Sequence, residues 1–337
     1  MKLMRYIAFP IVPIYYFVTW LRNKLYDSGI KSSKSYSLPL ICVGNLSAGG
    51  TGKTPMVEYL IRLLKDDYVL ATLSRGYGRK TKGYVLGTSS SSAVTLGDEP
   101  FQFYNAFSKD IKVAVDGDRQ NGIKNLLNLK PPPEIILLDD AFQHRKVKAG
   151  FNVLLTTYSN LYTDDWVLPT GNLREPRTGA KRAQIIVITK CPAILSEAEK
   201  EKIINKINPE IHQQVFFSKI GYSNAVVSEN KKIELKTLPQ FTLVTGIANA
   251  KPLVDFLKLN NLDFNHLEYK DHHQFTENDI KTIEKSEFVL TTEKDYMRLK
   301  DFSSLKNKLY YLPIQTEIDN ALGFDSLIKQ FVINYAS

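Results

Sequence analysis

Short apolar runs alternate with amphipathic stretches along most of the chain. Runs of strand length fall at 38–43, 69–73, 111–115, 135–138, 151–156 and 184–189, and then at 241–245, 264–269, 287–291 and 309–312. Segments with helical spacing lie between many of these runs, and a further one covers about 322–335. This alternation of strands and helices predicts an α/β fold with mainly parallel sheets.

The length of 337 residues suits two domains. We expect an N-terminal helix over 1–30, a core over 31–220 and a smaller α/β domain over 221–337. A hairpin over 225–236, which turns at Glu229-Asn230-Lys231, is expected to join the two domains.

The most informative stretch is LPLICVGNLSAGGTGKT, residues 38–54. It runs from a buried strand through a glycine-rich loop into an amphipathic helix over 55–64, which is the context of a P-loop. Such a loop turns its backbone N–H groups toward phosphate oxygens, beside the positive end of a helix dipole. The expected nucleotide contacts are Ser47, Ala48, Gly49, Gly50, Thr51, Gly52, Lys53 and Thr54.

Within this loop, Lys53 is expected to reach the β- and γ-phosphates, and the Thr54 hydroxyl to bind Mg²⁺. Ser47 stands where the pattern usually has its first glycine. A serine can begin the loop if its φ is negative, so we interpret this departure as a tolerated variant.

A second strand supports the nucleotide site. The apolar run 135–138 ends in Asp139 and Asp140, and an acidic residue at such a strand end holds the Mg²⁺ shell of a P-loop site. The strand over 184–189 ends in Thr189-Lys190-Cys191-Pro192. Because a GTPase would place an aspartate where Pro192 stands, this turn argues against guanine and favours ATP.

Residues 1–27 form a second distinctive stretch. The run 7–21 is nearly all apolar or aromatic, and Lys2, Arg5, Arg22 and Lys24 flank it. It lacks a signal-peptide cleavage site, is short for a membrane span, and contains two prolines. We expect an interfacial helix on the cytoplasmic leaflet. A helix packed on the protein's own core and a single spanning anchor remain as alternatives.

The net charge of +9 suits a nucleic acid, an anionic membrane or a phosphorylated substrate, and does not choose among them. No aromatic–basic motif indicates nucleic acid, so we expect none as a partner. Cys42 and Cys191 lie in apolar runs without metal-ligand spacing. They are typical of small buried residues in a reducing compartment.

Taken together, the motifs resemble the tetraacyldisaccharide 4′-kinases of lipid A biosynthesis. In chain order they are GNLSAGGTGKTP, SRGYGR, GDEP, DGDR, DDAFQHR, GNLREP, TKCP, DHH and TEKD. With the N-terminal helix they cover most of the chain. Ala141 departs from the family, which often has glycine there.

The resemblance implies a P-loop kinase core that uses ATP and Mg²⁺. The implied reaction phosphorylates the 4′-hydroxyl of a tetraacylated glucosamine disaccharide 1-phosphate and gives lipid IVA. The implied location is the cytoplasmic face of the bacterial inner membrane, where the lipid and the leaflet are the partners. We expect a monomer.

The resemblance also implies roles for single residues. Asp98 of GDEP looks like the catalytic base, and His272 of DHH looks like its partner across the domain cleft. Lys53 would hold phosphate, and Thr54, Asp139 and Asp140 would hold Mg²⁺. The implied substrate contacts are Asn45, Arg75, Arg119, Gln143, His144, Asn172, Arg174 and Glu175.

Two other functions use the same P-loop. One is a nucleotide-hydrolysing switch or metallochaperone, against which Pro192 and the lack of a Cys/His metal motif speak. The other is a membrane-recruited nucleotide-binding scaffold. Nucleotide hydrolysis without a lipid acceptor would favour either of them.

Overall fold

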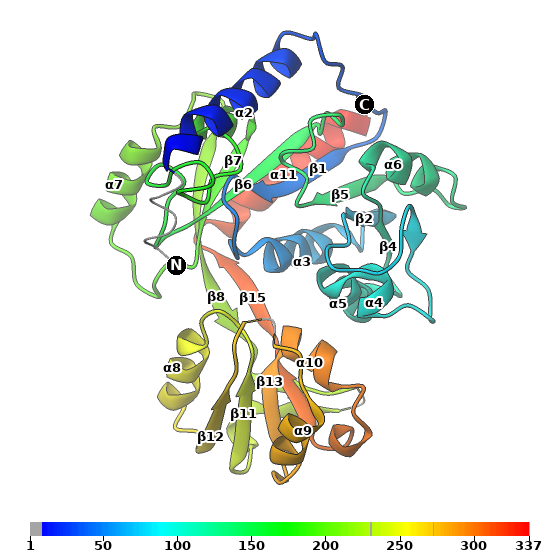
Figure 1. The fold of residues 1–337 in the computed structure, drawn as a ribbon, viewed down its shortest axis with the longest axis vertical. Coiled ribbons are helices and arrows are strands. Elements are labelled where there is room, and N and C mark those ends of the chain that lie inside the picture. The colour runs from blue at the N-terminus through cyan, green and yellow to red at the C-terminus, as the bar shows by residue number, and fades with distance from the viewer. Residues whose placement is uncertain (1–8, 230, 272, 337) are drawn as a thin grey trace. The chain divides into compact units, whose positions relative to one another are not determined.

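The computed structural model, which describes residues 9–229, 231–271 and 273–336, is built on two mainly parallel sheets (Figure 1). The first unit comprises the chain up to Ile220 and the segment from Thr316 onward; the second comprises Gly221–Gln315. The domain predicted over 221–337 therefore has to be corrected at its far end. Helix α11 (Ala321–Ala336) belongs to the first unit, where Phe324, Ile328 and Val332 are buried.

The first unit contains the strands β1 (Leu40–Asn45), β2 (Leu70–Ser74), β3 (Val85–Leu86), β4 (Ile111–Val115), β5 (Ile135–Asp139), β6 (Phe151–Thr157) and β7 (Ile185–Thr189). Its helices are η1 (Phe9–Ile11), α2 (Val12–Asp27), α3 (Lys53–Leu64), α4 (Ala93–Leu96), α5 (Asp98–Phe107), α6 (Arg119–Leu127), η2 (Arg177–Arg182), α7 (Glu197–Ile207) and α11. Two strands, β8 (Gln214–Tyr222) and β15 (Ile314–Ile318), pass from one unit into the other.

The sheet of the first unit has the strand order β15-β8-β7-β6-β1-β5-β2-β4-β3. Strands β1, β2 and β4 to β8 are paired in parallel, and β3 is antiparallel to β4. Since parallel strands end at one edge, the residues after β1, β5, β2 and β4 meet there. This edge carries the P-loop and both predicted carboxylates.

Side chains alternate between the two faces of the sheet, and β1 is buried along its whole length. Leu40 and Cys42 belong to a core with residues of α6 and α7, whereas Ile41 and Val43 pack with α3, α5 and α11. Both faces are therefore covered by helices. Neither cysteine is in a disulfide.

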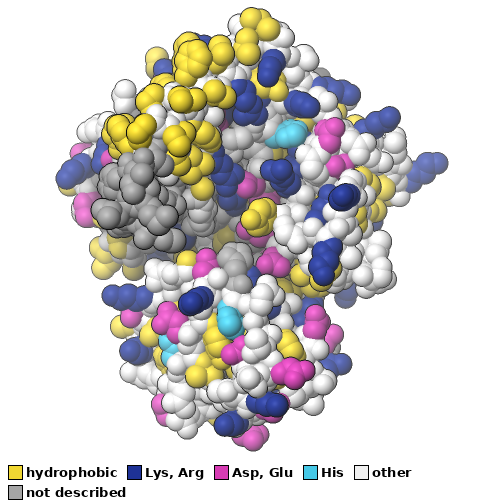
Figure 2. Space-filling view, in the orientation of Figure 1, with side chains coloured by type: hydrophobic (Ala, Val, Ile, Leu, Met, Phe, Trp, Pro, Cys, Tyr) yellow, Lys and Arg dark blue, Asp and Glu magenta, His cyan; other side chains and the backbone are white. Residues whose placement is uncertain are grey.

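The N-terminal helix runs from Val12 to Asp27, with Pro13 in its first turn, where a missing N–H is tolerated. Its Val12 and Asn23 are buried, whereas Phe9, Ile11, Ile14, Phe17 and Val18 nearby are between 48% and 65% exposed. Figure 2 shows hydrophobic side chains gathered along α2. Within the described ranges, no helix has both the length and the apolarity needed to cross a bilayer.

The second unit contains β9 (Ala225–Val227), β10 (Lys232–Glu234), η3 (Leu235–Thr237), β11 (Phe241–Thr245), α8 (Lys251–Leu259), β12 (Phe264–Glu268), α9 (Glu277–Ile283), β13 (Val289–Thr292), α10 (Glu293–Leu299), η4 (Ser303–Leu305) and β14 (Leu309–Leu312). Its sheet has the order β10-β9-β14-β13-β11-β12. Strands β12, β11, β13 and β14 are parallel, and β9 and β10 form the predicted antiparallel hairpin.

Candidate active site

The phosphate-binding loop lies between β1 and α3, as the sequence predicts. Gly49 and Gly52 have φ values of 137° and 87°, which L side chains rarely adopt. Ser47 is not among the residues with positive φ, so a serine can begin the loop here. The helix begins at Lys53, two residues before the predicted start, and brings its N-terminal N–H groups to the loop.

Side chains at the ends of β1 and β7, together with Lys190, fix the shape of this loop. Asn45 Nδ2 donates to Thr51 Oγ1 at 2.7 Å, and Thr189 Oγ1 donates to the Thr51 carbonyl at 2.8 Å. Lys190 Nζ donates to the Gly50 carbonyl at 2.6 Å, and Lys190 has a φ of 57°. The TKCP turn therefore braces the phosphate-binding loop, a function that its sequence alone did not indicate.

Three charged side chains meet beside the loop. Lys53 Nζ lies 3.7 Å from Asp140 Oδ1, and Lys53 is only 8% exposed. Arg174 NH1 donates to both Asp140 oxygens, at 2.9 and 3.1 Å. Asp140 has a φ of 46°, so the chain turns sharply after β5 and points this carboxylate at the two cations.

Asp139, the last residue of β5, is 3% exposed and accepts a hydrogen bond from Ser74 Oγ at 3.0 Å through Oδ2. Its Oδ1 is buried and has no hydrogen-bond partner in the described chain. Burial, then Glu99 and Asp140, raise the pKa of the Asp139 carboxyl to about 7, against the lowering effect of Lys53.

These donors fit a magnesium ion. Mg²⁺ binds through one or two carboxylates and a hydroxyl, and takes its other oxygens from phosphate and water. Asp139, Asp140 and the half-buried Thr54 supply that set. Asp139 Oδ1 accepts no hydrogen bond in the described chain, so this oxygen is available to a cation. No cluster of three or more His, Cys, Asp or Glu residues with metal-binding geometry occurs among the described residues. The fit is thus to a phosphate-associated ion, not to an all-protein cage.

Asp98 is the first residue of α5, half-buried, and follows Gly97. A Cβ at Gly97 would lie 2.7 Å from the Tyr77 carbonyl, so the SRGYGR loop packs directly against the start of α5. This contact places the loop of Arg75 and Arg79 beside Asp98 at the carboxyl edge of the sheet.

An open pocket of about 560 Å³ lies along the same edge. Its lining includes Arg75, Arg79 and Lys82 from one loop, and Asp116 and Asp118 from the turn after β4. Arg75 is exposed, whereas Arg79 donates to the Gly83 carbonyl at 2.6 Å. Arg75 therefore has the guanidinium better placed to meet a soluble or lipid-borne anion.

Two predicted substrate contacts are more deeply placed. Arg119 is 2% exposed and donates to the backbone carbonyls of Asp116 and Asp139. The Nε2 atom of His144 is buried and has no hydrogen-bond partner in the part of the chain that is described. Burial and the charge of Arg119 lower the His144 pKa, so its imidazole is neutral at pH 7.

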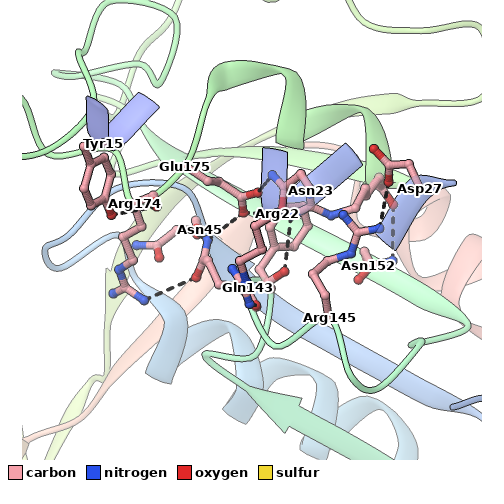
Figure 3. Close-up of polar contacts among 12 residues, drawn as sticks. Tyr15, Arg22, Asn23, Asp27, Asn45, Gln143, Arg145, Asn152, Arg174 and Glu175 are labelled. Carbon is pink, nitrogen blue, oxygen red and sulfur yellow. Dashed lines mark hydrogen bonds and ion pairs between the residues drawn. The ribbon is translucent and has the colours of Figure 1, made fainter. Parts of the chain in front are cut away.

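Asn45, Gln143 and Glu175, three of the remaining predicted contacts, lie in one polar network (Figure 3). Gln143 Nε2 donates to the Asn45 carbonyl at 2.8 Å and to Glu175 Oε1 at 3.1 Å. Glu175 is 1% exposed and also accepts from Arg182 at 2.7 Å. Asn172 Nδ2 donates to Asp165 Oδ2 at 2.9 Å, and its carbonyl accepts from the Ala48 N–H at 2.7 Å. Their side chains and backbone hold the loop around the phosphate site.

In the second unit, His272 lies outside the described residues. Its neighbour His273 contacts Asp279 Oδ2 at 2.9 Å and stacks on Tyr269. Asp295 of the TEKD motif is fully buried and accepts from the Gly246 N–H and from Thr292 Oγ1.

Four residues near the site were missed in the sequence. Asn23 and Arg182 contact Glu175, Ser74 contacts Asp139, and Lys190 contacts the Gly50 carbonyl. Asn23 stands between Arg22 and Lys24, so no signal in the sequence indicates that it is buried. Ser74 ends β2, Arg182 ends the short helix η2 and Lys190 follows β7, positions at which polar residues are common and carry no such signal either.

A P-loop with a buried lysine, an adjacent acidic strand end and a basic pocket is typical of P-loop nucleotide-binding proteins, a class that includes phosphotransferases. The profile of the tetraacyldisaccharide-1-P 4′-kinase family matches residues 4–332. The chain therefore belongs to this family, and the switch and scaffold alternatives are set aside.

Individual relatives agree. The tetraacyldisaccharide 4′-kinase of Flavobacterium johnsoniae is 51% identical over 339 residues, which covers 98% of each chain. That of Bacteroides fragilis is 46% identical over 319 residues, covering 88% of this chain and 85% of the relative. The crystal structure of Aquifex aeolicus LpxK in complex with ATP is 27% identical, with a TM-score of 0.77 and coverage of 98% and 99%.

Proposed function

We propose that this kinase transfers the γ-phosphate of ATP to the 4′-hydroxyl of a tetraacylated glucosamine disaccharide 1-phosphate, which gives lipid IVA. The observation that carries the proposal is the junction of Lys53 and Asp140 beside the phosphate-binding loop, next to the unpartnered Asp139 oxygen. Phosphoryl transfer depends mainly on positioning and charge neutralisation, and these groups supply both.

The chain's own groups would hold the nucleotide. The N–H groups of 47–54 cradle the phosphates, and Lys53 neutralises charge on the γ-phosphate. To do so, Lys53 moves from Asp140 to phosphate over a short path, since it lies at the edge of ion-pair distance at 3.7 Å. Thr54, Asp139 and Asp140 would hold Mg²⁺, which would supply positive charge against the charge that develops on the phosphate during transfer.

Asp98 is proposed as the general base that accepts the proton of the sugar hydroxyl, with His272 as its partner. The position of Asp98 at the start of α5, beside the SRGYGR loop, supports this role. Substituting alanine for Asp98 or for His272 should lower kcat by about 10²–10⁴-fold, the usual contribution of a general base. Wild-type turnover in either variant would remove that residue from the mechanism.

The 1-phosphate of the acceptor is proposed to meet the basic pocket. Among the candidate arginines, Arg75 is exposed, Arg174 is paired with Asp140, and Arg177 donates to the Asp165 carbonyl. Arg75 is thus the first choice for the phosphate contact. Arg75→Ala should raise the KM for the lipid more than it lowers kcat.

Residues 1–27 are proposed to attach the enzyme to the cytoplasmic leaflet of the inner membrane, where it acts as a monomer. The exposed apolar side chains of η1 and α2 and the exposed Lys24 support an interfacial location. Deletion of 1–27 should release the protein from lipid vesicles. Continued sedimentation with lipid would place the attachment elsewhere.

The direct test is transfer from γ-labelled ATP to a tetraacyl disaccharide 1-phosphate in detergent with Mg²⁺. The expected product is labelled bis-phosphorylated lipid that disappears in Lys53→Ala. Omitting Mg²⁺ tests the metal separately. Label released only as free phosphate, whether or not lipid is present, would contradict the proposal.

A further inference from the structure

Helix α2 does more than expose an apolar surface. Its other side carries polar side chains that contact the segments next to the phosphate-binding loop (Figure 3). Tyr15 OH donates to the Arg174 carbonyl at 2.9 Å, and Arg22 NH2 donates to the Gln143 carbonyl at 2.7 Å. The helix therefore touches the two segments that also hold Asp140 and the loop.

Asn23 makes the most deeply buried of these contacts. It is 7% exposed, and its Nδ2 donates to Glu175 Oε2 at 2.6 Å. Glu175 Oε1 accepts from Gln143, and the same Gln143 nitrogen donates to the Asn45 carbonyl. Asn45 in turn donates to Thr51 in the phosphate-binding loop. A continuous chain of hydrogen bonds thus runs from α2 to that loop.

Burial makes this series of hydrogen bonds sensitive to the loss of any one of its members. A carboxylate that is 1% exposed needs every donor around it, because water cannot replace a missing one. Arg182 neutralises Glu175 through Oε1, which leaves Asn23 as the described donor to Oε2. Without Asn23, Glu175 would have to rotate toward another donor and would pull Gln143 with it.

We propose that Asn23 is a positioning residue that couples the seating of α2 to the geometry of the phosphate-binding loop through Glu175 and Gln143. In the described part of the protein the Asn23 side chain donates to Glu175 and not to the phosphate-binding loop, so it acts on that loop through the series of hydrogen bonds. The kinetic test of this inference rests on the proposed function, whereas the measurement of nucleotide affinity is independent of it. By linkage, nucleotide in the loop also favours the seated helix.

The geometry offers an exchange experiment. Asn23→Asp places two carboxylates face to face. In Glu175→Gln the contact is kept, because the amide of Asn23 can turn and present its Oδ1, which has no partner in the described chain, to the new amide donor. In the double variant the amide of residue 175 donates to the carboxylate of residue 23, and its carbonyl oxygen still accepts from Gln143 and Arg182. A contact that matters for positioning should therefore be lost in Asn23→Asp and regained when Glu175→Gln is added.

For the full-length enzyme in detergent, Asn23→Asp should lower kcat/KM for ATP by about 10–100-fold, the effect of losing a hydrogen bond to a charged group, whereas Glu175→Gln alone should have a smaller effect. The double variant should return to within about threefold of wild type. The Kd of a fluorescent ADP analogue, measured without lipid, should follow the same order. Vesicle binding should be unchanged in all of them, since the exposed face of α2 is intact.

Asn205→Asp, on the exposed face of α7, is the matched control and should behave as wild type. If a single variant fails to fold, Asn23→Leu replaces it and tests the same loss without added charge. Additive losses in the double variant, or unchanged ADP affinity in every variant, would overturn the inference. Failure of wild type to phosphorylate the lipid would instead overturn the proposed function, and the ADP measurement would still decide the role of Asn23.

Discussion

Each unit carries a buried aspartate at the carboxyl edge of its parallel sheet, and the two differ in one respect. Asp139 ends β5 of the first unit at 3% exposure; Asp295 lies in α10, just after β13 of the second unit, at 0% exposure. Asp295 Oδ2 accepts from a backbone N–H and a hydroxyl, at 2.8 and 2.7 Å. Asp139 Oδ1 is buried and has no partner in the described chain.

The difference supports a structural role for Asp295 and the proposed ligand-binding role for Asp139. A buried carboxylate oxygen without a donor is unfavourable, and persists where the fold specifies it and a ligand completes it. Asp295 instead ties Gly246 after β11 to Thr292 of β13, so that the carboxylate replaces missing backbone partners. Position at a strand end is therefore not sufficient to identify a catalytic acid.

The largest expected effect comes from Asp139→Asn. The amide keeps the size of the side chain but removes the charge that binds a cation, so kcat should fall by about 10²–10³-fold. The free energy of unfolding should stay equal or rise at pH 8, because the variant no longer buries a carboxylate there. Steady-state kinetics and urea unfolding measure the two quantities.

Asp66→Asn is a suitable control for this comparison, because Asp66 is exposed on the same unit. It should change neither quantity. A normal kcat in Asp139→Asn would mean that the unpartnered oxygen has no part in the reaction, and would remove the contrast between the two acids.

Asp295→Ala should have the opposite profile. Two buried donors, the Gly246 N–H and the Thr292 hydroxyl, lose their acceptor, and the free energy of unfolding should fall by about 2–4 kcal/mol. Chemical denaturation followed by circular dichroism measures this loss. The exposed Asp301→Ala serves as the control in the same unit. Unchanged stability in Asp295→Ala would show that its hydrogen bonds are replaced by water.

The contrast also shows how far sequence reasoning reaches. The strand β1, the phosphate-binding loop and α3 follow from local patterns, because apolar runs, glycines and helical spacing act over a few residues. The assignment of α11 to the first unit could not be predicted. Its apolar face fits either sheet, and the choice depends on contacts with residues such as Phe151 and Phe216 far away in the chain.

The residues of the candidate site, like the fold, could be predicted where local motifs mark them. Lys53, Asp139 and Asp140 stand at motif positions, and the structure places all three at one edge of the sheet. Glu175 carried the same kind of motif evidence, yet it is buried among Asn23, Gln143 and Arg182. A motif shows that a residue matters to the site; only the fold shows whether it faces the substrate or its neighbours.

A smaller effect is expected in the pH dependence of magnesium binding. Burial raises the pKa of Asp139 to about 7, above the value of about 3.9 for an unfolded chain. The folded state therefore holds this proton between about pH 4 and 7, and without metal the resulting stabilisation is lost as the pH rises through 7. Because the proposed Mg²⁺ site requires the deprotonated form of Asp139, the apparent affinity for Mg²⁺ should fall about tenfold per pH unit below 7.

Thermal melting with and without Mg²⁺ tests this titration. The increase in Tm that Mg²⁺ produces should be larger at pH 8 than at pH 6 in the wild type. In Asp139→Asn the increase should be small at both values. An equal increase at pH 6 and pH 8 in the wild type would place the pKa of the magnesium-binding carboxylate well below 6.

The smallest effect concerns Lys190, which extends the comparison to the brace of the loop. Its amine donates to the Gly50 carbonyl at 2.6 Å from a backbone with a φ of 57°. Lys190→Met removes the donor and should raise the KM for ATP by about 5–10-fold with little change in kcat, since one hydrogen bond is worth about 1 kcal/mol. Lys190→Gly should raise the KM for ATP equally. Glycine also relieves the left-handed backbone at this position, which adds up to about 1 kcal/mol to the free energy of unfolding, and the greater flexibility of glycine in the unfolded chain offsets part of this gain. If both variants keep the wild-type KM, the Lys190 contact contributes nothing to nucleotide binding, and the contacts of Asn45, Thr189 and the Asn172 carbonyl are sufficient to hold the loop.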